Sequence, residues 1–336
     1  MDVTFTQASG LQDSIYGNVQ APIQRFIEER GEEFERTSAL ELLFLMGSTT
    51  NFGDMLSSMT AMDGFDPVGE LGEYPTDGMV EGFQKFLPQE VWKNSFSLSR
   101  EIIEDSKIME LRQKPAQFTI AYLRTRELFG ASMFGAAMNG AKSMQFRGKS
   151  FDVSCADKEA LFSKAHPSIV NEKFKQSNMF SNAFTKDSLN RVESAMQMLK
   201  GDNGEELGIS PDTIVIPNDP DLKDEVFSVI GADKNPVNAE NSFNYQYGRW
   251  NVIIWSYLNR FIKPGQKPWF LADDSYNKLF GGAVWNDRTK LEVRSSVNEN
   301  NDANIWRGYA RYAATFFDWR AFCGGGMAGG DLLKAA

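Results

Sequence analysis

The only histidine of the chain, His166, is the first residue to consider for catalysis or metal binding, because imidazole serves both as a base and as a metal ligand. A zinc site here would need further ligands, and neither Cys155 nor Cys323 has a second ligand at a recognised spacing. No Gly-x-Ser-x-Gly elbow accompanies the histidine, which removes the usual esterase arrangement. We therefore expect His166 to be structural, fixed in a turn before Pro167.

Two acidic clusters and a glycine-rich segment are the other candidates for chemistry. Asp219-Pro220-Asp221 and Asp273-Asp274 could contribute to a hard-cation site, but each also fits a helix N-terminus, where an aspartate accepts from free N–H groups. Residues 324–330 lack the Gly-Lys-Ser/Thr ending of a phosphate loop and are expected to form a flexible terminus. The sequence thus predicts no catalytic residue, no cofactor and no metal.

Composition indicates a chain that can bury a large core. Its 336 residues are 42% hydrophobic and 12% aromatic, which suits two or more subdomains. The formal net charge of −10 and the absence of a basic tract argue against a nucleic-acid binder. No apolar run approaches the length that spans a bilayer, and the amino terminus has no export signal, so we expect a cytoplasmic protein. Because the cytoplasm is reducing, Cys155 and Cys323 are expected to be free, buried thiols.

The first hundred residues predict an arm followed by a hairpin. Residues 1–20 have no periodicity, Pro22 opens a helical pattern that Gly31 interrupts, and residues 40–46 form a second apolar helical segment. Residues 48–97 are rich in glycine and contain short alternating stretches such as residues 91–98, which is typical of a long, twisted hairpin.

Regular elements follow the hairpin. Ser99 is a predicted helix N-cap, and the strongest helical pattern then runs over residues 115–140. An amphipathic helix is expected over residues 187–200, a buried strand over residues 213–217, and another helix from the Asp219-Pro220 start to Gly231. In the last long strand, Ala310, Tyr312, Ala314 and Phe316 fall on one face, and Arg307, Tyr309 and Arg311 fall on the other.

The last quarter of the chain, from residue 269 onward, resembles the major capsid proteins of tailed bacteriophages. In those proteins the final strand alternates apolar and basic residues and ends in a turn of aspartate, an aromatic residue and arginine. The similar residues are Trp269-Phe270-Leu271, Gly281-Gly282-Ala283-Val284-Trp285, Trp306-Arg307-Gly308-Tyr309-Ala310-Arg311-Tyr312 and Phe317-Asp318-Trp319-Arg320-Ala321-Phe322. The phrase Leu161-Phe162-Ser163-Lys164-Ala165-His166-Pro167 is similar to one in Mu-like major head subunits.

The resemblance implies an α+β fold of the Hong Kong 97 type, and the order of elements agrees with it along nearly the full chain. The implied parts are an N-terminal arm (1–47), an extended loop (48–98), a peripheral domain (99–185) with a spine helix (115–140), an axial domain (186–290), and a return strand with a C-terminal tail (291–336).

The function implied by this resemblance is assembly of an icosahedral head shell, without catalysis. The implied partners are further copies of the chain in pentamers and hexamers, a scaffolding protein, a portal protein, an optional decoration protein, and double-stranded DNA that is enclosed without specific binding; no membrane is involved. A separate scaffolding protein is expected because the arm begins almost at Met1. The protein would be made in the cytoplasm of a bacterial host and end in the virion.

Candidate contacts between subunits are aromatic and basic side chains that a single copy would leave exposed. They are Phe83, Lys85, Phe86, Trp92, Phe96, Arg307 and Arg311. In members of the family that cross-link, a loop lysine bonds to an asparagine with the help of a glutamate. Lys85 or Lys93 could be the lysine and Asn304 the asparagine, but no Asp or Glu occurs between Ile305 and Phe317, so we expect no cross-link.

Two alternatives remain at this point. One is an encapsulin-like nanocompartment shell, which shares the fold but packages an enzyme instead of a genome. The other is an α+β enzyme whose site is built from scattered carboxylates.

Overall fold

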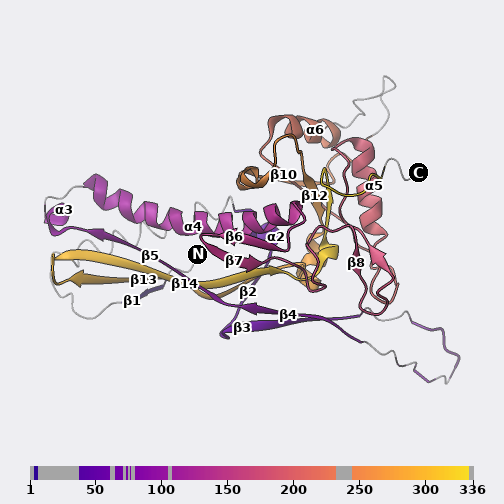
Figure 1. The fold of residues 1–336 in the computed structure, drawn as a ribbon, viewed down its shortest axis with the longest axis horizontal. Helices are drawn as coiled ribbons and strands as arrows, with labels where there is room; N and C mark the ends of the chain where they lie inside the picture. The colour runs from indigo at the N-terminus through magenta and orange to yellow at the C-terminus, as the bar shows by residue number, and fades with distance from the viewer. Residues whose placement is uncertain are drawn as a thin grey trace.

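The structure is a computed structural model that describes residues 4–6, 38–60, 65–70, 73–74, 76, 80–104, 108–231 and 244–332. It has an elongated part, in which a long helix lies along a sheet, and a lobe at one end that carries a second sheet (Figure 1). The helical pattern that begins at Pro22 lies outside the described residues.

The main sheet has the order β1, β13, β14, β5, with β2 on the same edge as β1. The strands are β1 (Thr4–Thr6), β2 (Leu45–Ser48), β5 (Glu90–Leu98), β13 (Ala283–Asn298) and β14 (Ala303–Phe316). β13, β14 and β5 are antiparallel, whereas β1 and β2 both run parallel to β13. As predicted, Ala310, Tyr312, Ala314 and Phe316 are buried while Arg307 is exposed.

Helix α4 (Ile108–Met138) covers one face of this sheet (Figure 1). It starts seven residues before the predicted boundary, so Pro115 lies inside the helix, where proline removes one backbone hydrogen bond. Gly308 lets the helix approach closely, since a Cβ there would lie 2.4 Å from the Phe118 ring. The short helix α3 (Arg100–Glu104) precedes α4, and the Ile102 N–H donates to Ser99 Oγ as the predicted cap requires.

A two-stranded hairpin, β3 (Gly53–Met59) and β4 (Glu81–Pro88), projects from the body (Figure 1). The expected hairpin over residues 48–98 is therefore too long, because β5 leaves it and pairs with β14. The helical segment expected over residues 40–46 is also wrong in its second half: α2 (Leu40–Leu43) ends and β2 follows. Residues 45–48 pair in parallel with β13, and a helical pattern does not anticipate this contact with a distant segment.

The lobe contains a four-stranded sheet in the order β11, β10, β12, β15. Its strands are β10 (Thr213–Pro217), β11 (Asn251–Trp255), β12 (Trp269–Ala272) and β15 (Phe322–Gly325). Its α-helices are α5 (Lys186–Gln197), α6 (Pro220–Ile230) and α7 (Asp274–Phe280). Two short 3-10 helices, η1 (Ser256–Phe261) and η2 (Trp319–Ala321), complete the lobe. Short pairs β6 (Ser143–Phe146) with β7 (Lys149–Asp152), and β8 (His166–Pro167) with β9 (Lys175–Gln176), connect the two parts.

Both acidic clusters cap helices, as expected. Asp219 Oδ1 accepts from the Leu222 N–H at 2.9 Å at the start of α6, and Asp273 Oδ1 accepts from the Tyr276 N–H at 2.8 Å at the start of α7. Each carboxylate satisfies a backbone donor that the helix itself leaves unpaired.

The expected flexible tail is wrong for residues 324 and 325, which belong to β15 and are buried. A Cβ at Gly325 would lie 2.3 Å from the Trp269 ring, so glycine is required for this strand to pair with β12. The glycines provide close packing, where composition suggested mobility.

One aromatic core joins the helix, the main sheet and the lobe. Near the end of α4, Phe134 stacks on Phe270 of β12 with 5.2 Å between ring centroids, and it meets Phe316 of β14 edge-on at 4.9 Å. Cys155 and Cys323 are free and buried in the same region, and burial raises the pKa of both thiols.

Candidate assembly surfaces

Trp92, expected to be uncovered on a hairpin, is covered by its own chain. Its ring stacks on Tyr312 at 4.8 Å and meets Phe129 of α4 edge-on at 5.4 Å. The indole N–H donates to the Tyr312 carbonyl at 3.2 Å. The premise that this residue lacks cover within the subunit is wrong, because β5 is part of the main sheet.

Phe96 follows the same pattern two pleats along β5. It stacks on Trp306 of β14 at 5.2 Å and contacts Phe118 of α4 at the same distance. Trp92 and Phe96 thus form the side of β5 that faces the helix. The alternation along β5 places both rings on one face as predicted, and the residues that cover this face are far away in the sequence.

Phe83 and Lys85 attach the base of the hairpin to the body. Phe83 packs with Leu56 on a small cluster of Ala156, Val284 and Phe317. Lys85 Nζ donates to the Ser154 carbonyl and lies 3.4 Å from Asp152 Oδ2.

The Lys85 contact also affects the acidity of Asp152. Partial burial opposes ionisation of this carboxyl, but the Ser154 N–H and the Lys85 ammonium outweigh it, so the pKa of Asp152 is lowered. The lysine is mostly buried, with 11% of its side chain exposed, and it is occupied within its own subunit.

Phe86 is the one predicted aromatic contact that stays largely outside. It lies opposite Met55 in the β3 and β4 register and next to Phe52, with 5.8 Å between ring centroids. Met59 continues the row on β3. We name Phe52, Met55, Met59 and Phe86 the hairpin stripe; their exposed fractions are 72%, 61%, 69% and 44%.

Three members of the hairpin stripe were not identified from the sequence. Met55 and Met59 alternate with less exposed residues along β3, which is the signal that would have found them. Four apolar side chains in one exposed row are unusual on a monomer and typical of an interaction surface.

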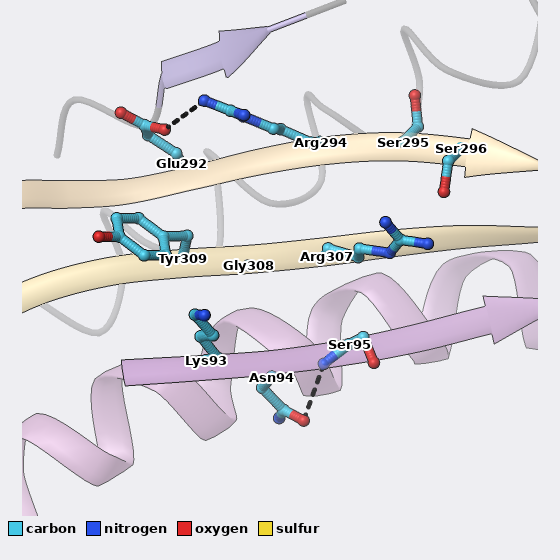
Figure 2. Close-up of a pocket in the computed structure, with 10 residues that line it drawn as sticks. All are labelled: Lys93, Asn94, Ser95, Glu292, Arg294, Ser295, Ser296, Arg307, Gly308 and Tyr309. Carbon is cyan, nitrogen blue, oxygen red and sulfur yellow. Dashed lines mark hydrogen bonds and ion pairs between the residues drawn. The ribbon is translucent and has the colours of Figure 1, made fainter. Parts of the chain in front are cut away.

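Arg307 and Arg311 lie on the face of the main sheet that points away from α4. Figure 2 shows Arg307 and Tyr309 on β14, between Lys93 on β5 and Arg294 on β13, with the helix behind the sheet. These residues surround an open hollow of about 1070 Å³. In the strand register, Arg311 lies opposite Val91 of β5 on one side and Thr289 of β13 on the other. Its Nε has no hydrogen-bond partner among the described residues.

Two buried polar pairs among the described residues hold parts of the fold together. His166 Nδ1 lies 2.6 Å from Asp157 Oδ2, its Nε2 lies 3.1 Å from Asn178 Oδ1, and its ring stacks on Trp319. The expected structural role of His166 agrees with these contacts, although the residue lies in a bridged strand pair. Within the described part of the chain, no group of three or more metal-binding side chains is found.

A second buried pair fixes the helix on the sheet. Arg126 of α4 binds Asp287 of β13 through two parallel hydrogen bonds of 2.9 and 3.0 Å. Burial alone would lower the pKa of Arg126, but Tyr122 and Asp287 raise it, so the guanidinium stays charged. No spacing in the sequence indicates this pair, whose members are 161 residues apart.

A spine helix on a mixed sheet, a projecting hairpin and a separate lobe with its own sheet define an α+β capsid fold of the Hong Kong 97 type. The sequence of residues 85–324 matches the model of a family described as phage capsid protein. Since the match covers well over half of the chain, the protein belongs to the phage capsid protein family and is a structural capsid protein.

Solved structures similar to this chain have low sequence identity to it. The capsid of the cyanophage P-SCSP1u is 10% identical with a TM-score of 0.50, and 88% of each chain is covered. Mycobacterium phage Patience is 12% identical with a TM-score of 0.48, covering 97% of this chain and 92% of that one. The capsid of an empty GTA particle is 12% identical with a TM-score of 0.47, covering 86% and 89%. A comparison with curated protein sequences gave no match.

None of the helices in the described ranges has the length and apolar character that crossing a bilayer requires.

Proposed function

We propose that this chain is the major capsid protein that forms the icosahedral head of a tailed bacteriophage, as pentamers and hexamers around double-stranded DNA. The observation that supports self-assembly most directly is the hairpin stripe, because its own subunit does not cover it. Many weak contacts of this kind, repeated by symmetry, add up to a stable shell.

The parts of the chain are assigned with one amendment to the boundaries expected from the sequence. Residues 1–47 are the arm, residues 48–88 the extended loop, residues 99–185 the peripheral domain, and residues 186–290 the axial domain. Residues 90–98 join the return strand in the peripheral sheet, since β5 pairs with β14. The axial lobe would place its loops at the centres of the capsomers.

The partners we propose are a scaffolding protein, a portal protein and, on some shells, a decoration protein. The net charge of −10 fits DNA that is enclosed without specific binding, because an acidic wall repels phosphates. Assembly would take place in the host cytoplasm, and the product is the virion. The chain would perform no catalysis.

Electron microscopy of the protein, expressed with and without a candidate scaffolding protein, tests this proposal. We expect closed, uniform shells with the partner, and tubes, aberrant shells or free capsomers without it. Uniform closed shells that form alone around an enzyme would favour a nanocompartment instead. Substrate turnover by the unassembled subunit would favour an enzyme.

A further inference from the structure

A cavity of about 80 Å³ lies between α4 and the main sheet, and we name it the α4 cavity. Apolar and aromatic side chains from both layers line it, among them Phe118 and Ala121 of α4, Trp92 of β5 and Leu291 of β13. Its volume is about half of the roughly 150 Å³ of an apolar cavity that holds benzene. The α4 cavity therefore has room for the hydrocarbon part of a very small molecule.

Tyr312 of β14 gives this cavity a polar group that the subunit does not satisfy. The residue is fully buried and lines the cavity, and its hydroxyl has no hydrogen-bond partner among the described residues. Burial raises the pKa of Tyr312 well above its usual value, against the opposing charges of Arg126 and Arg147, so the hydroxyl stays protonated. A buried O–H group without an acceptor is costly, and a ligand that brings an acceptor atom would remove this cost.

Arg147 adds a positive charge at the edge of the cavity. It is exposed, lines the cavity and donates from Nη2 to Thr125 Oγ1 of α4 at 3.0 Å. Within the described part of the chain it forms no ion pair, and the opposing charge that it places on Tyr312 shows that the two residues lie close together. Arg147 and Tyr312 thus offer hydrogen-bond donors, one of them charged, beside an apolar wall.

The backbone at Arg147 indicates that this side chain is not there for the sake of the turn. Arg147 and Gly148 are the two turn residues between β6 and β7, and their φ angles are 51° and 83°. Such a turn favours asparagine, aspartate or glycine at both positions, because each has a left-handed backbone. An arginine is unfavourable in this position, so its long cationic side chain calls for another explanation, and the α4 cavity beside it supplies one.

We propose that the α4 cavity binds a short-chain carboxylate. The carboxylate accepts hydrogen bonds from Tyr312 and Arg147, and the alkyl chain lies against Phe118, Ala121 and Leu291. Arginine favours a carboxylate over a neutral head group, and pockets of this kind combine apolar walls with a few placed polar groups. The bound molecule would join α4, the main sheet and the turn between β6 and β7, and so stabilise the subunit. The site lies within one subunit and does not depend on shell assembly.

Methyl NMR of the unassembled subunit tests the proposal, with isobutyrate as the probe. The methyl signals of Ala121, Ala310 and Leu291, which line the cavity, should shift saturably with a Kd of about 1 mM, as expected of so small a ligand. Isobutyramide has the same shape without the charge and should bind about tenfold more weakly. The melting temperature of the subunit should rise with isobutyrate concentration.

Two variants assign the polar contacts. Arg147→Ala should lower the affinity for isobutyrate about tenfold and abolish the preference over isobutyramide, whereas Arg124→Ala, on an exposed arginine of α4 outside the cavity, is the matched control and should change neither. Tyr312→Phe should lower the affinity about fivefold. The empty Tyr312→Phe subunit should melt no lower than the unchanged chain, because the hydroxyl has no partner to lose; a clear fall in its melting temperature would show that the hydroxyl is already bonded and would count against the site.

Filling the cavity locates the binding. Ala121→Leu should abolish the saturable shifts while the subunit stays folded, because the larger side chain occupies the space of the alkyl chain. Shifts that persist in the folded variant would place the ligand elsewhere and refute the proposal. The absence of saturable shifts in the unchanged chain would show that the cavity holds only water, and equal affinity for isobutyrate and isobutyramide would refute the role of the carboxylate. None of these measurements uses shells, so their failure leaves the proposed function standing.

Discussion

The indole of Trp92 lies flat on the ring of Tyr312 and donates its N–H to the carbonyl of that same residue, 220 positions along the chain. This pair joins β5, which follows the hairpin in the chain, to β14 near the C-terminus, on the face of the sheet that α4 covers. Removing either ring would open a gap between the sheet and the helix.

Trp92→Ala should therefore destabilise the subunit itself. We expect a loss of about 3 kcal/mol in the free energy of unfolding, since the substitution empties an aromatic site in the core and removes a hydrogen bond. Denaturant unfolding of the unassembled subunit measures this. A variant that folds with near-normal stability but forms no shells would return Trp92 to the interface.

Phe52→Ala is the matched change on the hairpin stripe and should have the opposite effect. The ring is 72% exposed, so stability of the subunit should change little, whereas each contact between subunits should weaken by about 2 kcal/mol. Sedimentation separates shells from free subunits. Shells formed in normal yield would exclude Phe52 from the assembly interface.

Hydrogen exchange should distinguish the hairpin tip from the strand that follows it. Amides of residues 65, 66, 68–70, 73 and 74 should exchange quickly in free subunits and become protected in shells, because few contacts of the subunit cover them. Amides of β5 should be protected in both states, since that strand belongs to the main sheet. Equal protection of the tip before and after assembly would contradict this expectation.

The Lys85 contact at the hairpin base should depend on pH. Because the pKa of Asp152 is lowered in the folded chain, the stability that this contact contributes is present above the unfolded pKa of about 3.9 and is lost as the pH falls through the folded value. The protection of the β4 amides in free subunits, measured relative to the intrinsic exchange rate at each pH, should accordingly fall at acidic pH. Asp152→Asn should show the lower protection already at neutral pH and remove this part of the pH dependence.

Assembled shells should contain no covalent cross-link between subunits. Lys85 is held by Ser154 and Asp152 of its own subunit, and Asn304 is buried in the main sheet. Shells boiled in detergent should therefore run as single chains on a gel. A ladder of multimers that persists under reducing conditions would show that one of these side chains is released on assembly.

Most local elements could be predicted from the amino-acid sequence, and its resemblance to phage capsid proteins implied the class of fold. Alternation in residues 91–98 and 303–316, the long helical pattern after Pro115, and aspartates at 219 and 273 each specify structure through neighbouring residues. Local signals of this kind are set by backbone geometry and capping, so a chain need not be folded for them to be recognised.

Which surfaces are covered depends on the tertiary structure. Whether Trp92 is buried depends on Tyr312 and Phe129, and whether residues 324 and 325 are rigid depends on Trp269 in the neighbouring strand. The cationic hollow likewise exists because pairing of β5, β14 and β13 places Lys93, Arg307 and Arg294 on one face. Burial and charge clustering arise from contacts between distant segments, and alternation along one strand gives the two faces without saying what covers either of them.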